Sequence, residues 1–183
     1  MLTEIADAQT TLIVGLAIWM VAFPACAASS MLLARLGRPS PLSSLARFGA
    51  TASVGAILVF LSAMMAFVVV VAPAHAAGSD VTVLAHVVGF FASTVDWIVT
   101  AIVLGLAPAA AVFAGRDIWA PRWLQRFAAF TVAVTVVGLI ALAADNRDVA
   151  LILVPVGLAH LACSGITALR QTGNGLSAMK LGV

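Results

Sequence analysis

The sequence predicts an all-helical membrane protein, a polytopic bundle of five transmembrane helices in a single domain. Of its 183 residues, 63% are hydrophobic and 9% are charged, whereas a soluble domain has about 45–50% apolar and about 25% charged residues. The apolar residues form five runs, each long enough to cross a hydrocarbon core of about 30 Å, which takes ~20 helical residues. Turn-forming and charged residues separate these runs.

The breaks between the runs set the bounds of the predicted helices. An Arg- and Pro-rich stretch at residues 35–41 ends the first run, and Pro73 lies near the end of the second. Gly115 and Pro121 separate the third run from the fourth, and an Asp-Asn-Arg-Asp turn at residues 145–148 precedes the fifth. The predicted spans are residues 12–33, 48–71, 81–113, 127–144 and 149–169, followed by a flexible cytoplasmic tail at 171–183.

The third run is longer than a bilayer requires. As a straight helix, residues 81–113 would extend roughly 50 Å at 1.5 Å per residue. We therefore expect this span to tilt, to kink at Pro108 or to project beyond the bilayer. Pro24 and Pro155 are expected to bend the first and fifth spans in a similar way.

The basic residues predict an orientation. With five spans, eight of the nine fall on one side of the membrane and only Arg147 on the other. The positive-inside rule then places the N-terminus outside and the C-terminus in the cytoplasm, and we expect a bacterial cytoplasmic (inner) membrane. Trp119 and Trp123, which neighbour arginines at a helix end, are expected in the interfacial belt. The eight basic residues are Arg35, Arg38, Arg47, Arg116, Arg122, Arg126, Arg170 and Lys180.

A polar face on the third span is the first candidate for function. His86, Gly89, Ser93, Asp96 and Thr100 follow one another at steps of 3, 4, 3 and 4 residues, the spacing of a single helical face. Their neighbours along the chain are almost all apolar. A carboxylate in the middle of such a span costs a few kcal/mol on insertion scales, so it is a functional hypothesis by default.

The fifth span repeats this pattern. Gly157, His160, Ser164, Thr167 and Gln171 have the same spacing. In the predicted topology both spans run from outside to inside. Counted from the acids that precede each span, the aspartate of the third span and the histidine of the fifth differ in depth by only about 6 Å.

The two polar faces together predict a cluster near the middle of the membrane if the two helices are neighbours. Asp96, His160 and Ser93 would form it. Because histidine changes charge near neutral pH, an Asp–His pair can load and release one proton. The hydroxyl groups of Thr100 and Ser164 can hold water or coordinate a small cation. The sequence therefore predicts proton- or cation-coupled transport or conduction, in a homo-oligomer.

Two other interpretations stay open. Short loops and abundant small residues also fit a non-catalytic accessory subunit of a larger inner-membrane complex, respiratory or transport. A redox subunit holding haem b or quinone would use His75 and His86 near the outer surface, because a bis-histidine haem needs two imidazoles at one level. His86 and His160 differ in depth by about 9 Å, which disfavours them as a pair. No cofactor is predicted outside this last interpretation.

Several classes of function lack their signatures. The sequence contains no GxSxG, HExxH, phosphate-binding glycine loop or acidic Mg²⁺ cluster, so we predict no enzyme. Cys26 and Cys163 form no CxxC and have no ligand partner at zinc spacing, so no metal site is predicted. A net charge of +2 without a basic stripe among aromatic residues argues against nucleic acid. The expected partners are the lipid bilayer and other membrane chains.

Overall fold

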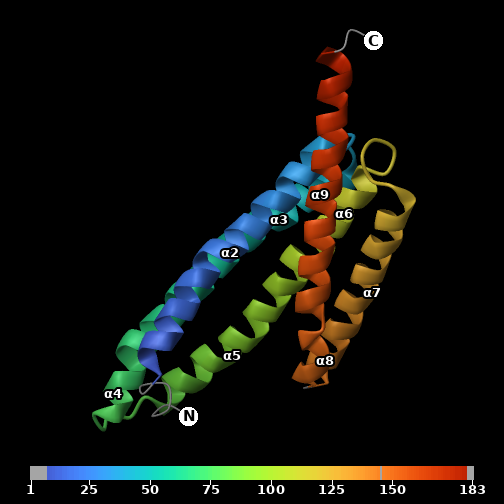
Figure 1. The fold of residues 1–183 in the computed structure, drawn as a ribbon. Helices are drawn as coiled ribbons and strands as arrows, with labels where there is room; N and C mark the ends of the chain where they lie inside the picture. The colour runs from blue at the N-terminus through green and yellow to red at the C-terminus, as the bar shows by residue number, and fades with distance from the viewer. Residues whose placement is uncertain (1–7, 145, 181–183) are drawn as a thin grey trace. The chain divides into compact units, whose positions relative to one another are not determined.

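The structure is a computed structural model that describes residues 8–144 and 146–180, without the side chains of residues 92, 93, 147 and 174–180. Throughout the described chain the regular elements are helices (Figure 1). Five segments are long and apolar enough to cross a membrane, which confirms the helical class and the number of candidate spans. These segments are Gln9–Leu36, Pro41–Ala76, Thr82–Ala114, Arg122–Ala143 and Asp148–Gly173.

The five segments contain α-helices and two short π-helices, η1 and η2. Their bounds are α2 Gln9–Leu36, α3 Pro41–Ala66, η1 Phe67–Val71, α4 Ala72–Ala76, α5 Thr82–Thr100, η2 Ala101–Leu106, α6 Ala107–Ala114, α7 Arg122–Ala143, α8 Arg147–Leu151 and α9 Leu153–Lys180. Helix α9 continues beyond the predicted end of the fifth span at Leu169. It therefore includes most of the segment 171–183 that the sequence predicts as a tail, and the flexibility of that segment stays a prediction.

The contacts divide the chain into two compact units. Unit 1 comprises Met1–Ala25 and Val54–Val99, and unit 2 comprises Cys26–Ser53 and Thr100–Val183. The division falls within α2 and α3 and near the end of α5, so each of these helices contributes to both units.

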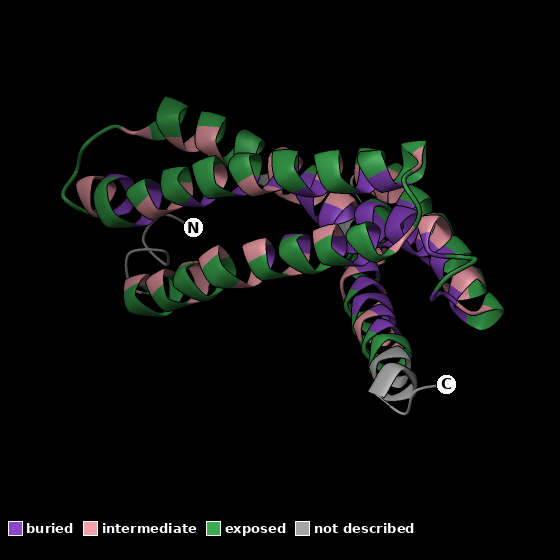
Figure 2. Cartoon of the chain, turned by 90° about the horizontal axis from the view of Figure 1, so that it is seen from above, coloured by how far each residue is buried: buried purple, intermediate pink, exposed green. Residues whose placement is uncertain are grey.

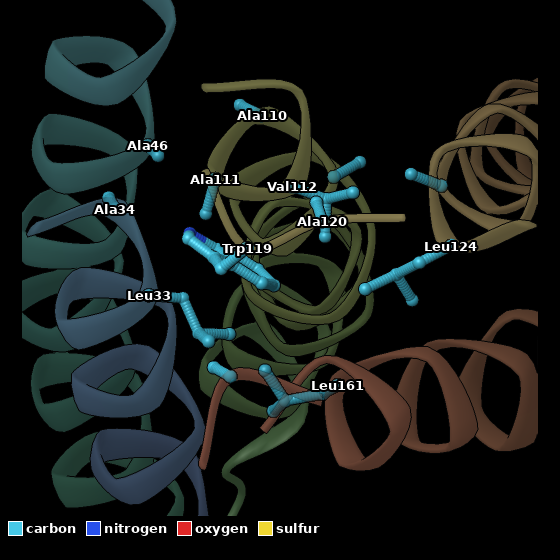
Figure 3. Close-up of a cluster of buried hydrophobic side chains, with 13 residues drawn as sticks. Leu33, Ala34, Ala46, Ala110, Ala111, Val112, Trp119, Ala120, Leu124 and Leu161 are labelled. Atoms are coloured by element: carbon cyan, nitrogen blue, oxygen red, sulfur yellow. The ribbon is translucent and has the colours of Figure 1, made fainter. Parts of the chain in front are cut away.

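Unit 2 is built around α6, which forms the last part of the third span. Helices η2, α6, α7 and α9 pack against one another, and α6 is buried from Ala107 to Val112. Leu33 of α2, Ala46 of α3 and Leu161 of α9 join the same core (Figure 3). Figure 2 shows the buried residues of this unit gathered where its helices meet. The many alanines in the core allow the helix backbones to approach closely.

Trp119 belongs to this core. Its side chain is 3% exposed and lies against Gly115, where an added Cβ would overlap the indole nitrogen. Trp119 is thus a core residue rather than the interfacial residue that the sequence predicts. Trp123 is exposed on the first turn of α7, where an interfacial tryptophan would lie.

Two of the long helices contain a π-helical segment that ends two residues before a proline. η1 precedes Pro73 and η2 precedes Pro108. Proline has no N–H to donate, and its ring clashes with the carbonyl four residues earlier. In η2 the N–H of Ala107 bonds the carbonyl oxygen of Ile102, five residues back, and η1 has the equivalent bond. The interruption predicted at Pro108 therefore takes the form of a π-bulge.

Ser40 caps the N-terminus of α3. Its hydroxyl oxygen accepts a hydrogen bond from the N–H of Ser43 at 3.2 Å, and the Ser43 hydroxyl oxygen accepts one from the N–H of Ser40 at 3.0 Å. Pro41 follows at the first helical position, where its missing N–H has no consequence. This reciprocal arrangement matches a capping box, with serine in place of the usual Glu or Gln.

The substitution Ser40→Ala is expected to lower the free energy of unfolding by about 1 kcal/mol. The N–H of the buried Ser43 would lose its acceptor at a helix end, where the backbone itself offers none. Denaturation in mixed micelles, followed by helical circular dichroism, measures the change. Ser44→Ala is the matched control, because Ser44 follows Ser43 directly and its side chain is exposed. Equal losses in both variants would contradict the capping role.

Unit 1 contains the N-terminal part of α2, the C-terminal part of α3 with η1 and α4, and most of α5. The amide of Gln9 donates to the carbonyl oxygen of Val68 at 3.4 Å and so links α2 to η1. At the start of α5 the exposed carboxylate of Asp80 accepts from the N–H of Thr82 at 3.1 Å. Hydrogen bonds from Thr82, and to a lesser extent the charge of His75, lower the pKa of Asp80. Asp80 therefore places a negative charge at the positive end of this helix.

Candidate functional site

The imidazole of His160 is completely buried in unit 2. It is 0% exposed, and neither Nδ1 nor Nε2 has a hydrogen-bond partner among the described residues. Its ring meets Phe127 of α7 edge-on, with 5.3 Å between the centroids and 76° between the planes. A buried polar group without a partner costs about 1–3 kcal/mol. Stability therefore does not explain the presence of a histidine at this position.

His160 lies on the buried face of α9. Leu153, Gly157, His160, Ser164 and Ala168 are all buried, and their spacing is that of one helical face. The Ser164 hydroxyl donates to the backbone carbonyl oxygen of His160 at 2.8 Å. Its proton is therefore engaged within its own helix, while the lone pairs of its oxygen remain available as acceptors.

Helix α7 contributes two more buried hydroxyl groups. Thr131 and Thr135 are each 0% exposed. Their hydroxyls donate to the carbonyl oxygens of Phe127 at 2.9 Å and of Thr131 at 2.8 Å. Like Ser164, these groups can act toward a third group only as acceptors. We call Thr100, Thr131, Thr135, His160 and Ser164 the polar interior of unit 2; all five are buried.

Two glycines hold the π-helical segment η2 against its neighbours. An added Cβ on Gly157 would lie 2.6 Å from Cβ and 2.7 Å from the carbonyl oxygen of Leu104. An added Cβ on Gly105 would overlap the hydroxyl of Thr135. The carbonyl of Leu104 thus faces α9 at Gly157, one turn before His160. In a regular α-helix the N–H of residue 108 would donate a hydrogen bond to this carbonyl, but Pro108 has no N–H. Irregular backbone at membrane depth occurs where it is buried in protein or lines a polar site.

The residues predicted for the site fall in both units. Thr100, His160 and Ser164 are in unit 2 and are buried. Asp96 is in unit 1, half-buried near the end of α5. Ser93 is helical in its backbone, and its side chain lies outside the description. Of these residues, Ser164 and His160 are linked by a hydrogen bond from the Ser164 hydroxyl to the backbone carbonyl oxygen of His160. The pairing of Asp96 with His160 would connect the two units, and it stays a prediction.

The histidines of the haem interpretation both lie in unit 1. His75 is half-buried in α4, whereas His86 is exposed in α5 and donates from Nδ1 to the carbonyl oxygen of Thr82 at 2.9 Å. Within residues 8–144 and 146–180, no group of three or more His, Cys, Asp or Glu side chains could hold a metal ion. Haem ligation by His75 and His86 stays a prediction.

The chain was compared with families, proteins and structures that are already known. No protein-family model, curated protein or solved structure matches it.

The contribution of α7 was missing from the sequence-based site. Phe127, Thr131, Thr135 and Gly138 follow one another at steps of 4, 4 and 3 residues, which already indicates one face. No charged or titratable residue lies on that face, so the sequence does not mark it as functional in the way that Asp96 and His160 mark theirs. The sequence also contains an indication of the two π-helical segments. The tripeptide Ala-Pro-Ala directly follows each of them, at residues 72–74 and 107–109.

Proposed function

We propose that this protein is a small integral membrane protein that conducts protons, or transports a cation coupled to protons, through its helical bundle. The central titrating group is His160. The observation that supports this role is the fully buried imidazole whose two ring nitrogens have no partner in the described chain. Imidazole can accept a proton on one ring nitrogen and release one from the other, so this side chain is the candidate proton carrier of unit 2.

The polar interior of unit 2 suits the transfer of a proton. A neutral imidazole carries one N–H and one lone pair, so it can accept a proton on one nitrogen and release the other. The hydroxyl oxygens of Thr131, Thr135 and Ser164 already use their protons on backbone carbonyls, which leaves them as acceptors. An imidazolium in an apolar interior is costly without a counter-charge. Asp96 is proposed as that counter-charge.

The exterior of the helices is consistent with insertion into a bilayer. Large apolar side chains are exposed along each long helix, and in a membrane these would face lipid. From the distribution of basic residues we infer an outside N-terminus and a cytoplasmic C-terminus in a bacterial inner membrane. We expect a homo-oligomer. Examples of the exposed apolar residues are Val21, Phe48, Val59, Phe90, Ile140 and Leu169.

Proton flux in liposomes tests this proposal. The full chain is reconstituted with an internal pH-sensitive dye, and a K⁺ gradient with valinomycin drives proton entry. We expect flux well above that of empty liposomes, and at least tenfold less in His160→Leu and in Asp96→Asn. Asp148→Asn and His86→Gln are the matched controls, because both residues are exposed, and they are expected to keep the wild-type flux.

Each alternative has its own outcome. Wild-type protein that carries neither protons nor Na⁺ or K⁺ would overturn the proposal. Unchanged flux in Asp96→Asn would remove Asp96 from the pathway and leave His160 as its titrating group. Purification from the native membrane with stoichiometric partner chains would favour an accessory subunit. A Soret absorption band would favour the redox interpretation.

A further inference from the structure

A groove of about 830 Å³ lies between α2 and α9 in unit 2. Small-molecule pockets are usually about 300–1,000 Å³. Its walls are the C-terminal part of α2, from Ser29 to Leu36, and a long stretch of α9, from Leu158 to Thr172. Leu33 and Leu161 belong to the core of the unit (Figure 3). They line the groove as well.

The groove is apolar along most of its length and polar toward one end. The two helices run in the same direction (Figure 1). Arg35, in the last turn of α2, and Thr172 of α9 therefore lie toward the same end of the groove. Ser29, six residues before Arg35, is the other polar residue of the lining. The Thr172 hydroxyl bonds the carbonyl oxygens of Ala168 and Leu169, both at 3.1 Å. Arg35 therefore provides the free donor groups at this end.

The dimensions match one leaflet of a bilayer. Helix α9 lines the groove from Leu158 to Thr172, a distance of about 21 Å at 1.5 Å per residue. A bilayer with its headgroups is about 40–45 Å thick, so one leaflet is roughly the same length. A ligand that fills the groove would thus have a long apolar part and a headgroup at the level of Arg35.

The charge at the polar end selects an anion. Arg35 is exposed and has no carboxylate partner in the described part of the chain. A guanidinium group binds phosphate with two parallel hydrogen bonds, and its charge is permanent. In the proposed orientation Arg35 lies at the cytoplasmic surface, where anionic lipids attract basic side chains.

We propose that this groove binds one anionic phospholipid, with an acyl chain along the leucine and isoleucine side chains of α2 and α9 and the phosphate at Arg35. The site is independent of proton transfer. It depends on the groove and on the cation at its end, whereas the proposed conduction depends on His160. The two proposals can therefore fail separately.

Lipid retention measured by native mass spectrometry tests the site. The purified full chain is exchanged into detergent with equal amounts of phosphatidylglycerol and phosphatidylcholine, and the bound lipid is counted after mild delipidation. We expect the wild type to retain phosphatidylglycerol about fivefold better, the ratio that one arginine near a headgroup provides. Arg35→Gln is expected to abolish this preference while the groove still takes up lipid.

A second variant blocks the groove itself. An added Cβ at Gly165 meets nothing within 4 Å, and Gly165 lines the groove, so the side chain of Gly165→Leu is expected to occupy part of the groove. This variant is expected to lose the retention of both lipids. Arg170→Gln and Gly15→Leu are the matched controls: neither residue lines the groove, and Gly15 also has open space at Cβ. Both are expected to bind lipid like the wild type.

Three results would overturn this proposal. The first is equal retention of the two lipids by the wild type, and the second is normal retention by Gly165→Leu. The third is a dimer that Gly165→Leu dissociates, because a second copy of the chain would then occupy the groove. Helical circular dichroism of Arg35→Gln serves as the check on folding, because it does not depend on the proposed conduction.

Discussion

Gly157→Ala is expected to lower the free energy of unfolding by about 1–3 kcal/mol. The added methyl group would lie 2.7 Å from the carbonyl oxygen and 2.6 Å from Cβ of Leu104. A backbone oxygen and a Cβ cannot turn aside as the end of a long side chain can, so α9 and η2 would have to separate. Interiors packed at crystal-like density resist such a shift. Denaturation in mixed micelles, followed by helical circular dichroism, measures the loss.

Gly165→Ala is the matched control on the same helix. Its added methyl group would meet nothing within 4 Å. Because alanine favours helix over glycine by about 0.8–1.0 kcal/mol, this variant is expected to be unchanged or slightly more stable. If Gly157→Ala were as stable as Gly165→Ala, the close approach of α9 and η2 would not exist in the folded protein. Gly157→Ala is also expected to reduce proton flux, since Gly157 lies one turn from His160.

His160→Leu is expected to raise the free energy of unfolding by about 1 kcal/mol. It removes a buried polar side chain without partners, which costs the wild type about 1–3 kcal/mol. It also loses the edge-on contact with Phe127, and such aromatic contacts contribute about 0.5–1.5 kcal/mol. The first effect is the larger one. The same denaturation measurement gives the sign of the change.

The control for this variant is His86→Leu. His86 is exposed, and a change at an exposed position is expected to stay within about 0.5 kcal/mol. A gain in stability at His160 together with a loss of proton flux would identify a position kept for function at the expense of stability. A loss of more than about 1 kcal/mol in His160→Leu would show that the imidazole stabilises the fold and would favour a structural role.

The helices themselves were predictable because their signals are local. Five apolar runs with Pro, Gly and charged residues between them gave the number of candidate spans, and four of the five segments end within about five residues of the predicted bounds at each end. The second segment begins earlier, at Pro41, because Ser40 and Ser43 cap it there. A capping interaction among polar residues lies outside the apolar run, and only the apolar run indicates a span in the sequence.

The partners of individual side chains were less predictable. Trp119 was expected at the membrane interface, but it lies in the core because Gly115 leaves room for its ring. The spacing of Phe127, Thr131 and Thr135 was visible in the sequence, and its importance emerged only from their burial. A helical face can be derived from spacing, whereas the neighbour of that face depends on contacts far apart in the chain.

The pattern of apolar and polar residues along the chain is enough to predict helices that can cross a membrane five times, and it identifies His160 and Asp96 as polar groups in apolar surroundings. The packing of the helices was needed to show that His160 is fully buried against Phe127, that η2 packs on Gly157, and that α2 and α9 form a groove ending at Arg35. The physical reason is that helix formation depends on residues within a few turns of one another. Burial and unpaired hydrogen-bonding groups depend instead on which helices pack together.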